Sequence, residues 1–266
     1  MSADDPLDSV RLRRELLEPG ALWCCLDVVA ETGSTNADLA ARARAGEPSG
    51  AVLITDHQSA GRGRLGRTWT APAGSSIAMS VLVRPHDVDP ARWTWLPLLA
   101  GVAVVEALRR AAEAYAVLKW PNDVLVDGRK ICGILAERVE TPHGPACVVG
   151  MGLNVHLDED ELPVPTATSL AVLNPSRVLG RNPLITTILR AFAAIYSEWE
   201  SSSDDPAFAL SYVKRCDTIG RRVRVSVAGG ETVEGEAEAI DRAGRLVVRT
   251  PTGVRILGAG DVVHLR

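Results

Sequence analysis

The chain has 266 residues, of which 46% are hydrophobic, and its formal net charge is −4. This composition supports a sizeable core and excludes a wholly disordered chain, while the acidic balance argues against a surface built throughout for nucleic acid. The length allows one large domain, or a main domain with a small one beside it.

The cysteines and the N-terminus indicate the compartment. Five cysteines without a C-x-x-C pair argue against a disulfide framework or a thiolate zinc site and favour a reducing cytoplasm. The first residues are acidic and lack an apolar signal segment, and no apolar run is long and unbroken enough to span a bilayer. We therefore expect a cytoplasmic protein without a membrane partner.

Hydrophobic periodicity predicts the elements of the first half of the chain. Apolar residues at helical spacing indicate a helix over 8–18, ended by Pro19-Gly20. The pattern then predicts, in order, a buried strand over 22–30, a short helix from about 36 to 46, a strand over 51–57, a half-buried strand over 75–84 and a long helix over 96–114. The broad apolar surface of that last helix indicates that it packs on a sheet.

A hairpin and a glycine-containing strand are predicted next. Strands over 116–126 and 129–139 are joined at Asp127-Gly128, which is a strong hairpin signal. The following strand, over 146–156, is interrupted by Gly150 and Gly152. Glycines inside a strand permit the close approach of a ligand or of another backbone.

Two more helices are predicted, over 183–200 and 205–215, and the sequence pattern changes after Cys216. Residues 222–227 alternate, long helical patterns vanish, and three further short strands are expected, so this end of the chain predicts a small β-barrel packed on the main body. The predicted class is α+β: a central mixed sheet flanked by helices in residues 1–216, followed by the small barrel in residues 217–266.

Residues 61–69, Gly-Arg-Gly-Arg-Leu-Gly-Arg-Thr-Trp, are the most unusual stretch. Glycines let backbone N–H groups approach an anion, and arginines present planar forks of donors that match phosphate or carboxylate. The stretch therefore predicts a mobile loop that orders around an anion. A solvated basic turn explains the loop equally well when it is taken alone.

Polar residues elsewhere suggest further binding groups. Ser34, Thr35 and Asn36 precede a helix, where one of them is its N-cap or the three together hold a small neutral polar group such as a ureido or amide. Pro121 follows a strand and fixes a turn from which Asn122 and Asp123 project. Asp123 is an Asx-turn residue, a ligand for Mg²⁺ or a group that orients an amine. Lys130 opens a strand in which Gly133 implies that something needs space. Histidines show no metal-ligand spacing, so the chemistry on offer is cationic and suits attack at phosphorus.

Five blocks in a fixed order resemble the biotin–protein ligases. They are Ser34-Thr-Asn36, Gln58 to Trp69, Lys119-Trp-Pro-Asn-Asp123, Lys130-Ile-Cys-Gly-Ile-Leu135 and Gly150-Met-Gly-Leu-Asn154. The resemblance implies a class II synthetase-like catalytic domain and a C-terminal SH3-like β-barrel. It also implies a two-step reaction, in which biotin and ATP give biotinyl-5′-adenylate and a lysine of a biotin carboxyl carrier domain then takes the biotinyl group.

The resemblance also implies roles for individual residues. Biotin binding is expected at Ser34, Thr35, Asn36, Gln58, Gly61, Arg62, Gly63, Arg64, Lys130 and Gly133. ATP binding is expected at Arg64, Arg67, Trp69, Asn122, Asp123 and Asn154. Lys130, Arg62 and Arg64 are the expected catalytic residues, and Asp123 is the expected Mg²⁺ ligand.

About twenty residues precede the first predicted core strand, which matches the short members of the family without an N-terminal DNA-binding domain. We therefore expect no sequence-specific DNA binding, and a monomer or weak homodimer. A lipoate–protein ligase or octanoyl transferase is the closest alternative activity. A nucleic-acid-binding module is disfavoured by 4% aromatic content and the acidic total, and a non-catalytic biotin-binding protein is the third alternative.

Overall fold

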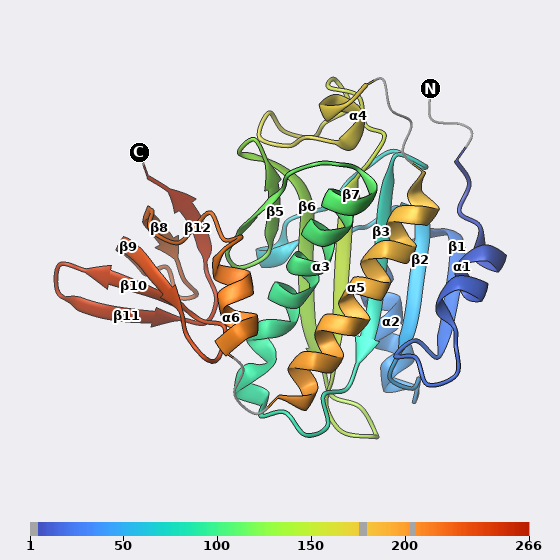
Figure 1. Cartoon of the computed structure of the whole chain (residues 1–266), viewed down its shortest axis with the longest axis horizontal. Coiled ribbons are helices and arrows are strands. Elements are labelled where there is room, and N and C mark those ends of the chain that lie inside the picture. The colour runs from blue at the N-terminus through green and yellow to red at the C-terminus, as the bar shows by residue number, and fades with distance from the viewer. Residues whose placement is uncertain (1–4, 176–179, 203–205, 266) are drawn as a thin grey trace.

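The computed structural model describes residues 5–175, 180–202 and 206–265, and a seven-stranded sheet organises its larger part (Figure 1). The strand order is β1-β2-β3-β7-β6-β5-β4, and β1 pairs with β2 in parallel while every other neighbour is antiparallel. The strands are β1 Cys25–Thr32, β2 Ala51–Gln58, β3 Ser76–Val83, β4 Val117–Lys119, β5 Asp123–Val126, β6 Arg129–Val139 and β7 Ala146–Asn154. The predicted mixed sheet is confirmed.

Helices cover the two faces of this sheet unequally. The long helices α3 (Leu96–Ala111) and α5 (Arg181–Ser201) pack side by side on one face and enclose the main core, with α1 (Ser9–Leu16) against α5 and β1 (Figure 1). The shorter α2 (Thr35–Arg44) lies on the opposite face over a smaller apolar cluster that includes Leu39, Leu53 and Val148. Because α2 spans only ten residues, the face beyond its N-terminus is left for other groups.

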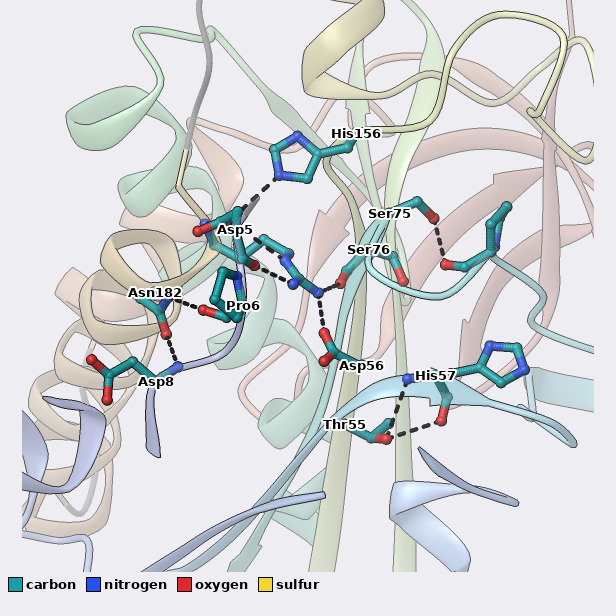
Figure 2. A network of polar contacts seen from close by, with 12 residues as sticks. Asp5, Pro6, Asp8, Thr55, Asp56, His57, Ser75, Ser76, His156 and Asn182 are labelled. Carbon is teal, nitrogen blue, oxygen red and sulfur yellow. Dashed lines mark hydrogen bonds and ion pairs between the residues drawn. The ribbon is translucent and has the colours of Figure 1, made fainter. Parts of the chain in front are cut away.

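The N-terminal segment is fastened to α5 by a polar network (Figure 2). Arg181, buried at the start of α5, donates from its backbone N–H to Asp5 Oδ2 at 2.6 Å and from Nη1 to Asp56 Oδ1 at 2.6 Å. Nη1 also reaches Ser76 O at 3.3 Å. Both Nη groups of the buried guanidinium have hydrogen-bond acceptors, and its Nε lies 3.5 Å from Asp5 Oδ2 as an ion pair. This network holds the ends of β2 and β3 against α5.

The C-terminal part is a five-stranded antiparallel sheet, with strand order β11-β10-β9-β8-β12 (Figure 1). Its strands are β8 Arg222–Ser226, β9 Thr232–Ile240, β10 Leu246–Thr250, β11 Gly253–Leu257 and β12 Asp261–His264. It is docked on the main body through tryptophans: Trp120 Nε1 donates to Gly244 O at 3.1 Å and Trp95 Nε1 donates to Arg242 O at 2.9 Å. The domain boundary after residue 216 stays a prediction; α6 (Pro206–Val213) is the last helix before β8.

Several predicted elements need correction. The single strand expected over 116–126 is two strands, because the chain turns at Trp120-Pro121, which is joined by a cis peptide bond, and β5 folds back on β4. The half-buried strand expected over 75–84 is buried along all of β3, since helices cover both faces there. The buried strand expected over 22–30 is the half-buried edge strand β1. The C-terminal sheet has five strands where four were expected.

The expectation that no apolar segment is long enough to span a bilayer needs correction for one helix. Pro90–Ala111, which includes the short 3₁₀ helix η2 (Pro90–Trp95), is long and apolar enough to cross a membrane by length and composition. Its window is 67% buried inside the fold, as expected for a core helix packed on a sheet and on α5.

Candidate active site

A pocket opens on the α2 face, where the N-terminus of α2 meets the middle strands of the sheet. It is lined by Ser34, Thr35, Asn36, Gln58, Arg62, Gly63, Arg64, Leu65, Arg67, Thr68, Trp69, Ala78, Met79, Asn122, Asp123, Lys130, Gly133, Ile134, Leu135, Gly150, Met151, Gly152 and Asp261. Thirteen of the fifteen predicted site residues are in this lining, and only Gly61 and Asn154 are not. The lining therefore comes from six separate stretches of the chain, between Ser34 and Asp261.

The polar end of the pocket is built at the α2 N-terminus. Ser34 caps the helix, with its Oγ accepting from Ala37 N at 3.4 Å. Thr35 donates to Gln58 Oε1 from its backbone N–H at 2.9 Å and from Oγ1 at 3.1 Å. These bonds orient the Gln58 amide by its oxygen, and its Nε2 has no acceptor among the described residues. A donor of this kind suits a neutral carbonyl group of a ligand.

Ser80 is a buried residue of this site that the sequence reasoning missed. Its hydroxyl lies 2.6 Å from Asn36 Oδ1 and 2.7 Å from Thr35 Oγ1, and the side chain is inaccessible to solvent. Asn36 in turn donates from Nδ2 to Leu135 O at 3.1 Å and to Glu137 Oε2 at 2.7 Å. A serine in the middle of an otherwise apolar strand was the available signal, because a buried hydroxyl needs a partner.

The floor of the pocket is made of glycine backbone. Gly133 on β6 pairs with Gly152 on β7, and the Trp69 indole lies on both. A Cβ added at Gly152 would be 2.6 Å from Trp69 Cε2, and one at Gly133 would be 3.2 Å from Trp69 Cζ3 and 3.0 Å from Lys130 Nζ. The space predicted at Gly133 therefore exists, and in this structure Trp69 and Lys130 use it.

The arginine stretch is a tight hairpin. Arg62 bridges to Thr68, Gly63 N donates to Arg67 O at 2.7 Å, and the tip turns through left-handed φ values of 56° at Leu65 and 75° at Gly66. Gly61 closes its base, where Trp69 N donates to Gly61 O at 2.9 Å and a Cβ would be 2.3 Å from Trp69 O. Gly61 is thus required by backbone packing, outside the pocket lining.

The three arginines have different surroundings. Arg64 Nη1 donates to Asn122 Oδ1 at 3.0 Å and to Gly260 O at 3.2 Å, and burial lowers the pKa of its guanidinium from the ordinary value. Arg67 forms an ion pair with Asp261 that raises the pKa of Arg67 and lowers that of Asp261. Arg62 is exposed at the pocket edge.

Lys130 lies beside the arginines in this pocket and forms an ion pair with Asp123. Lys130 Nζ lies 2.6 Å from Asp123 Oδ1, across the β5–β6 hairpin. The described residues contain no group of three or more His, Cys, Asp or Glu side chains that could hold a metal. Mg²⁺ that arrives with a nucleotide takes most of its ligands from phosphate and water, so a single carboxylate such as Asp123 is compatible with it.

Asn154 lies outside this pocket. It is buried at the end of β7, and its Nδ2 donates to Thr168 O at 2.9 Å. The amide thereby fixes the segment that follows β7. The ATP-binding role of Asn154 stays a prediction.

The pocket combines a polar end with one free amide donor, a flat floor without side chains, and a cationic rim of Lys130 and three arginines. Such a site suits a ligand with a neutral polar head and an anionic tail, beside a second anionic group. Lys130 and the arginines, facing these anionic groups, would stabilise the negative charge that develops during a reaction at phosphorus.

Comparison with known proteins gives consistent matches. The sequence matches the Biotin/lipoate A/B protein ligase family over residues 30–154 and the Biotin protein ligase C terminal domain over residues 218–265. It is 46% identical over 265 residues to the biotin--[acetyl-CoA-carboxylase] ligase of Mycobacterium tuberculosis, covering 98% of this chain and 97% of the relative.

Solved structures resemble the whole fold. The biotin protein ligase from Aquifex aeolicus in complex with biotin and ATP superposes with a TM-score of 0.75 and 25% identity, covering 92% of this chain and 100% of that one. The biotin protein ligase from Leishmania major in complex with biotinyl-5-AMP gives a TM-score of 0.59 at 25% identity, with 89% and 99% covered.

Proposed function

The chain belongs to the biotin protein ligase family, and from this premise we propose that it activates biotin with ATP and transfers the biotinyl group to a lysine of a biotin carboxyl carrier domain. The observation that carries the proposal is the pocket itself, in which a polar end, a glycine floor and a cationic rim match the ureido ring, the apolar body and the carboxylate of biotin. Similar proteins bind biotin with ATP, or biotinyl-5-AMP.

In the first step, a biotin carboxylate oxygen attacks the α-phosphorus of ATP, the bond to the β-phosphate oxygen breaks, and pyrophosphate leaves with the electron pair. We assign Lys130 and Arg64 to the charge on the carboxylate and the α-phosphate, because both are already fixed, by Asp123 and by Asn122 respectively. Fixed cations need no reorganisation in the transition state, which is the source of their catalytic effect. Mg²⁺ bound through Asp123 would neutralise phosphate charge.

In the second step, the neutral lysine amine of the carrier attacks the acyl carbon of biotinyl-5′-adenylate and AMP departs. Lys130 remains beside the same carboxyl-derived oxygens and stabilises the charge that forms on them. The hairpin of residues 61–69 covers the pocket, and Trp69 lies over its floor. This cover limits hydrolysis of the adenylate by water.

Arg67 is assigned to the triphosphate side and Arg62 to the carboxylate and phosphate. Arg67 has a carboxylate partner, Asp261, that a polyphosphate would replace or join. Ser34, Thr35 and Gln58 are assigned to the biotin ring, with the unpaired Gln58 Nε2 as a donor to the ureido oxygen.

The test is ATP-dependent transfer of labelled biotin to a biotin carboxyl carrier domain. We expect labelling with ATP and Mg²⁺, its loss in Lys130→Ala, and its retention in Lys214→Ala, a matched control at an exposed lysine after α6. Transfer of lipoate or an octanoyl group in place of biotin would show that the enzyme uses that acyl group as its substrate. No acyl transfer of any kind would refute the proposal.

We also propose a cytoplasmic location, no sequence-specific DNA binding, and a monomer or weak homodimer. All five cysteines are free, which a reducing compartment maintains. Sedimentation with and without biotin and ATP measures the oligomeric state, and saturable, sequence-selective binding of DNA in a gel-shift assay would contradict the second expectation.

A further inference from the structure

We propose that Glu137 and Ser80 are positioning residues for the biotin ring, and that they act through Asn36, which itself does not touch biotin. This inference rests on the proposed function, since it concerns the polar end of the same pocket. It assigns Asn36 a different role from the direct binding role that its motif implies.

The Asn36 amide nitrogen has no hydrogen left to donate to a ligand. Its Oδ1 lies 2.6 Å from the Ser80 hydroxyl, and the two hydrogens of Nδ2 go to Leu135 O at 3.1 Å and Glu137 Oε2 at 2.7 Å. The residue is 4% exposed. Both hydrogens of Nδ2 are engaged, so a ligand carbonyl could bond to this amide only by breaking a protein hydrogen bond. The oxygen Oδ1 keeps one lone pair, but it is bonded to Ser80 and lies against the backbone of Gly150.

The amide is also confined sterically. A Cβ at Gly150 would be 2.2 Å from Asn36 Oδ1, so the side chain lies directly on the β7 backbone. It thus joins α2 to three strands: β3 through Ser80, β6 through Leu135 and Glu137, and β7 through Gly150.

This anchor sets the residues on either side of the polar end. Thr35 precedes Asn36 at the helix start and holds Gln58 by two hydrogen bonds, and the Ser80 hydroxyl is also 2.7 Å from Thr35 Oγ1. A rotation or shift of the α2 N-terminus would move Thr35 and the Gln58 donor together. Polar groups that form directional hydrogen bonds to a ring must keep their positions to within a fraction of an ångström. The end of a helix holds its residues that precisely only when it is anchored to neighbouring elements.

Glu137 is the strongest point of the anchor and the best one to test. It is half-buried and is the only ionised group that bonds to Asn36 in the described part of the chain. A hydrogen bond to a charged acceptor is roughly twice as strong as one between neutral groups. Its loss would also leave a buried amide hydrogen without a partner.

The experiment compares Glu137→Ala and Glu137→Gln with wild type and with Glu140→Ala. Glu140 is a matched control because it is an exposed glutamate directly after the same strand. Glutamine keeps an oxygen acceptor for Asn36 Nδ2, whereas alanine does not. Biotin binding is measured by titration calorimetry without ATP, and biotin-dependent pyrophosphate release gives kcat and KM for biotin and for ATP. Thermal unfolding checks that each variant is folded.

We expect Glu137→Ala to weaken biotin binding by at most about a hundredfold, which is the full value of a charged hydrogen bond, with KM for ATP changed much less. It is an upper limit because the bond also exists in the free protein, and only the part that holds the binding geometry affects affinity. Glu137→Gln should recover most of the affinity, and Glu140→Ala should resemble wild type. Ser80→Ala should weaken biotin binding in the same direction.

Equal biotin affinity in Glu137→Ala and wild type would overturn the inference, and so would an equal rise in KM for biotin and for ATP. Should Glu137→Ala be unfolded, the comparison of Glu137→Gln with Ser80→Ala decides in the same way. Failure of wild type to release pyrophosphate with biotin would refute the proposed function instead, and the two failures are thus distinct.

Discussion

Replacing Gly150 by alanine tests how tightly the pocket wall is packed. The added Cβ would be 2.2 Å from Asn36 Oδ1 and 2.9 Å from Asn36 Cγ, far inside contact distance. Asn36 is buried and held by three hydrogen bonds, so it cannot move aside without breaking them. We therefore expect the added methyl group to displace Asn36 and break some of these hydrogen bonds.

The magnitude follows from those bonds. Two bonds between neutral groups contribute about 1 kcal/mol each and the bond to the Glu137 carboxylate about 1.5–3 kcal/mol, so complete loss costs about 3.5–5 kcal/mol. Partial relaxation lowers this cost, and alanine recovers about 0.5–1 kcal/mol that glycine loses in a strand. We expect Gly150→Ala to reduce the free energy of unfolding by about 2–4 kcal/mol.

The assay is urea unfolding of Gly150→Ala, Asn36→Ala and the double variant. If Asn36 is the obstacle, the methyl group should cost less than about 1 kcal/mol once Asn36 is alanine, so the two substitutions should be strongly non-additive. Gly258→Ala is the control, because its Cβ would meet only Arg245 side-chain carbons at 3.8 Å or beyond. An equal cost of Gly150→Ala in both backgrounds would refute the reasoning.

Three further outcomes follow from the structure. Trp120→Phe should lower the free energy of unfolding by about 1–3 kcal/mol in denaturant titration, because it leaves the buried Gly244 carbonyl without its donor. At pH 8, Cys24 should react with an alkylating agent in the native protein while Cys132 reacts only after unfolding, as mass spectrometry can show, since burial raises the pKa of the Cys132 thiol to about 12 and Cys24 is exposed. Burial also lowers the pKa of His264 below 6.5, so the unfolded chain binds that proton more readily; unfolding measured against pH should show stability falling below about pH 6.5, and less steeply in His264→Gln.

Local patterns predicted most of the elements, because each depends on nearby residues. Asp127-Gly128 needs only its own backbone: both residues have positive φ, at 50° and 75°, and the turn closes as predicted. Pro121 likewise marked the turn that the structure shows there, whereas the apolar pattern over 116–126 wrongly joined the strands on either side of it. Trp120 is 1% exposed because it packs under the C-terminal sheet and not because it belongs to a buried strand. No neighbouring residue in the sequence indicates that contact.

The sequence predicted which residues gather in the pocket better than it predicted their contacts. Gly133 was expected to leave room for a ligand, and the room exists, but only the fold shows that Trp69 shares it. Asn154 stands in the same sequence block as Gly150 and Gly152, yet it lies outside the pocket because it is at the far end of β7. Ser80 was missed because its partners, Thr35 and Asn36, are more than forty residues away.

The contribution of the C-terminal sheet to the pocket is the clearest case of a feature that sequence patterns cannot supply. Gly260 O accepts from Arg64 and Asp261 pairs with Arg67, and both acceptors lie nearly two hundred residues from the arginines. The Arg67 pair is exposed, so it contributes little to stability and can be exchanged for a phosphate at small cost. Arg64 is more buried and is also held by Asn122, so it keeps its place while Arg67 changes partner. Under the proposed function, Arg64 would stay fixed at the reaction centre, while Arg67 would exchange Asp261 for the phosphates of the nucleotide.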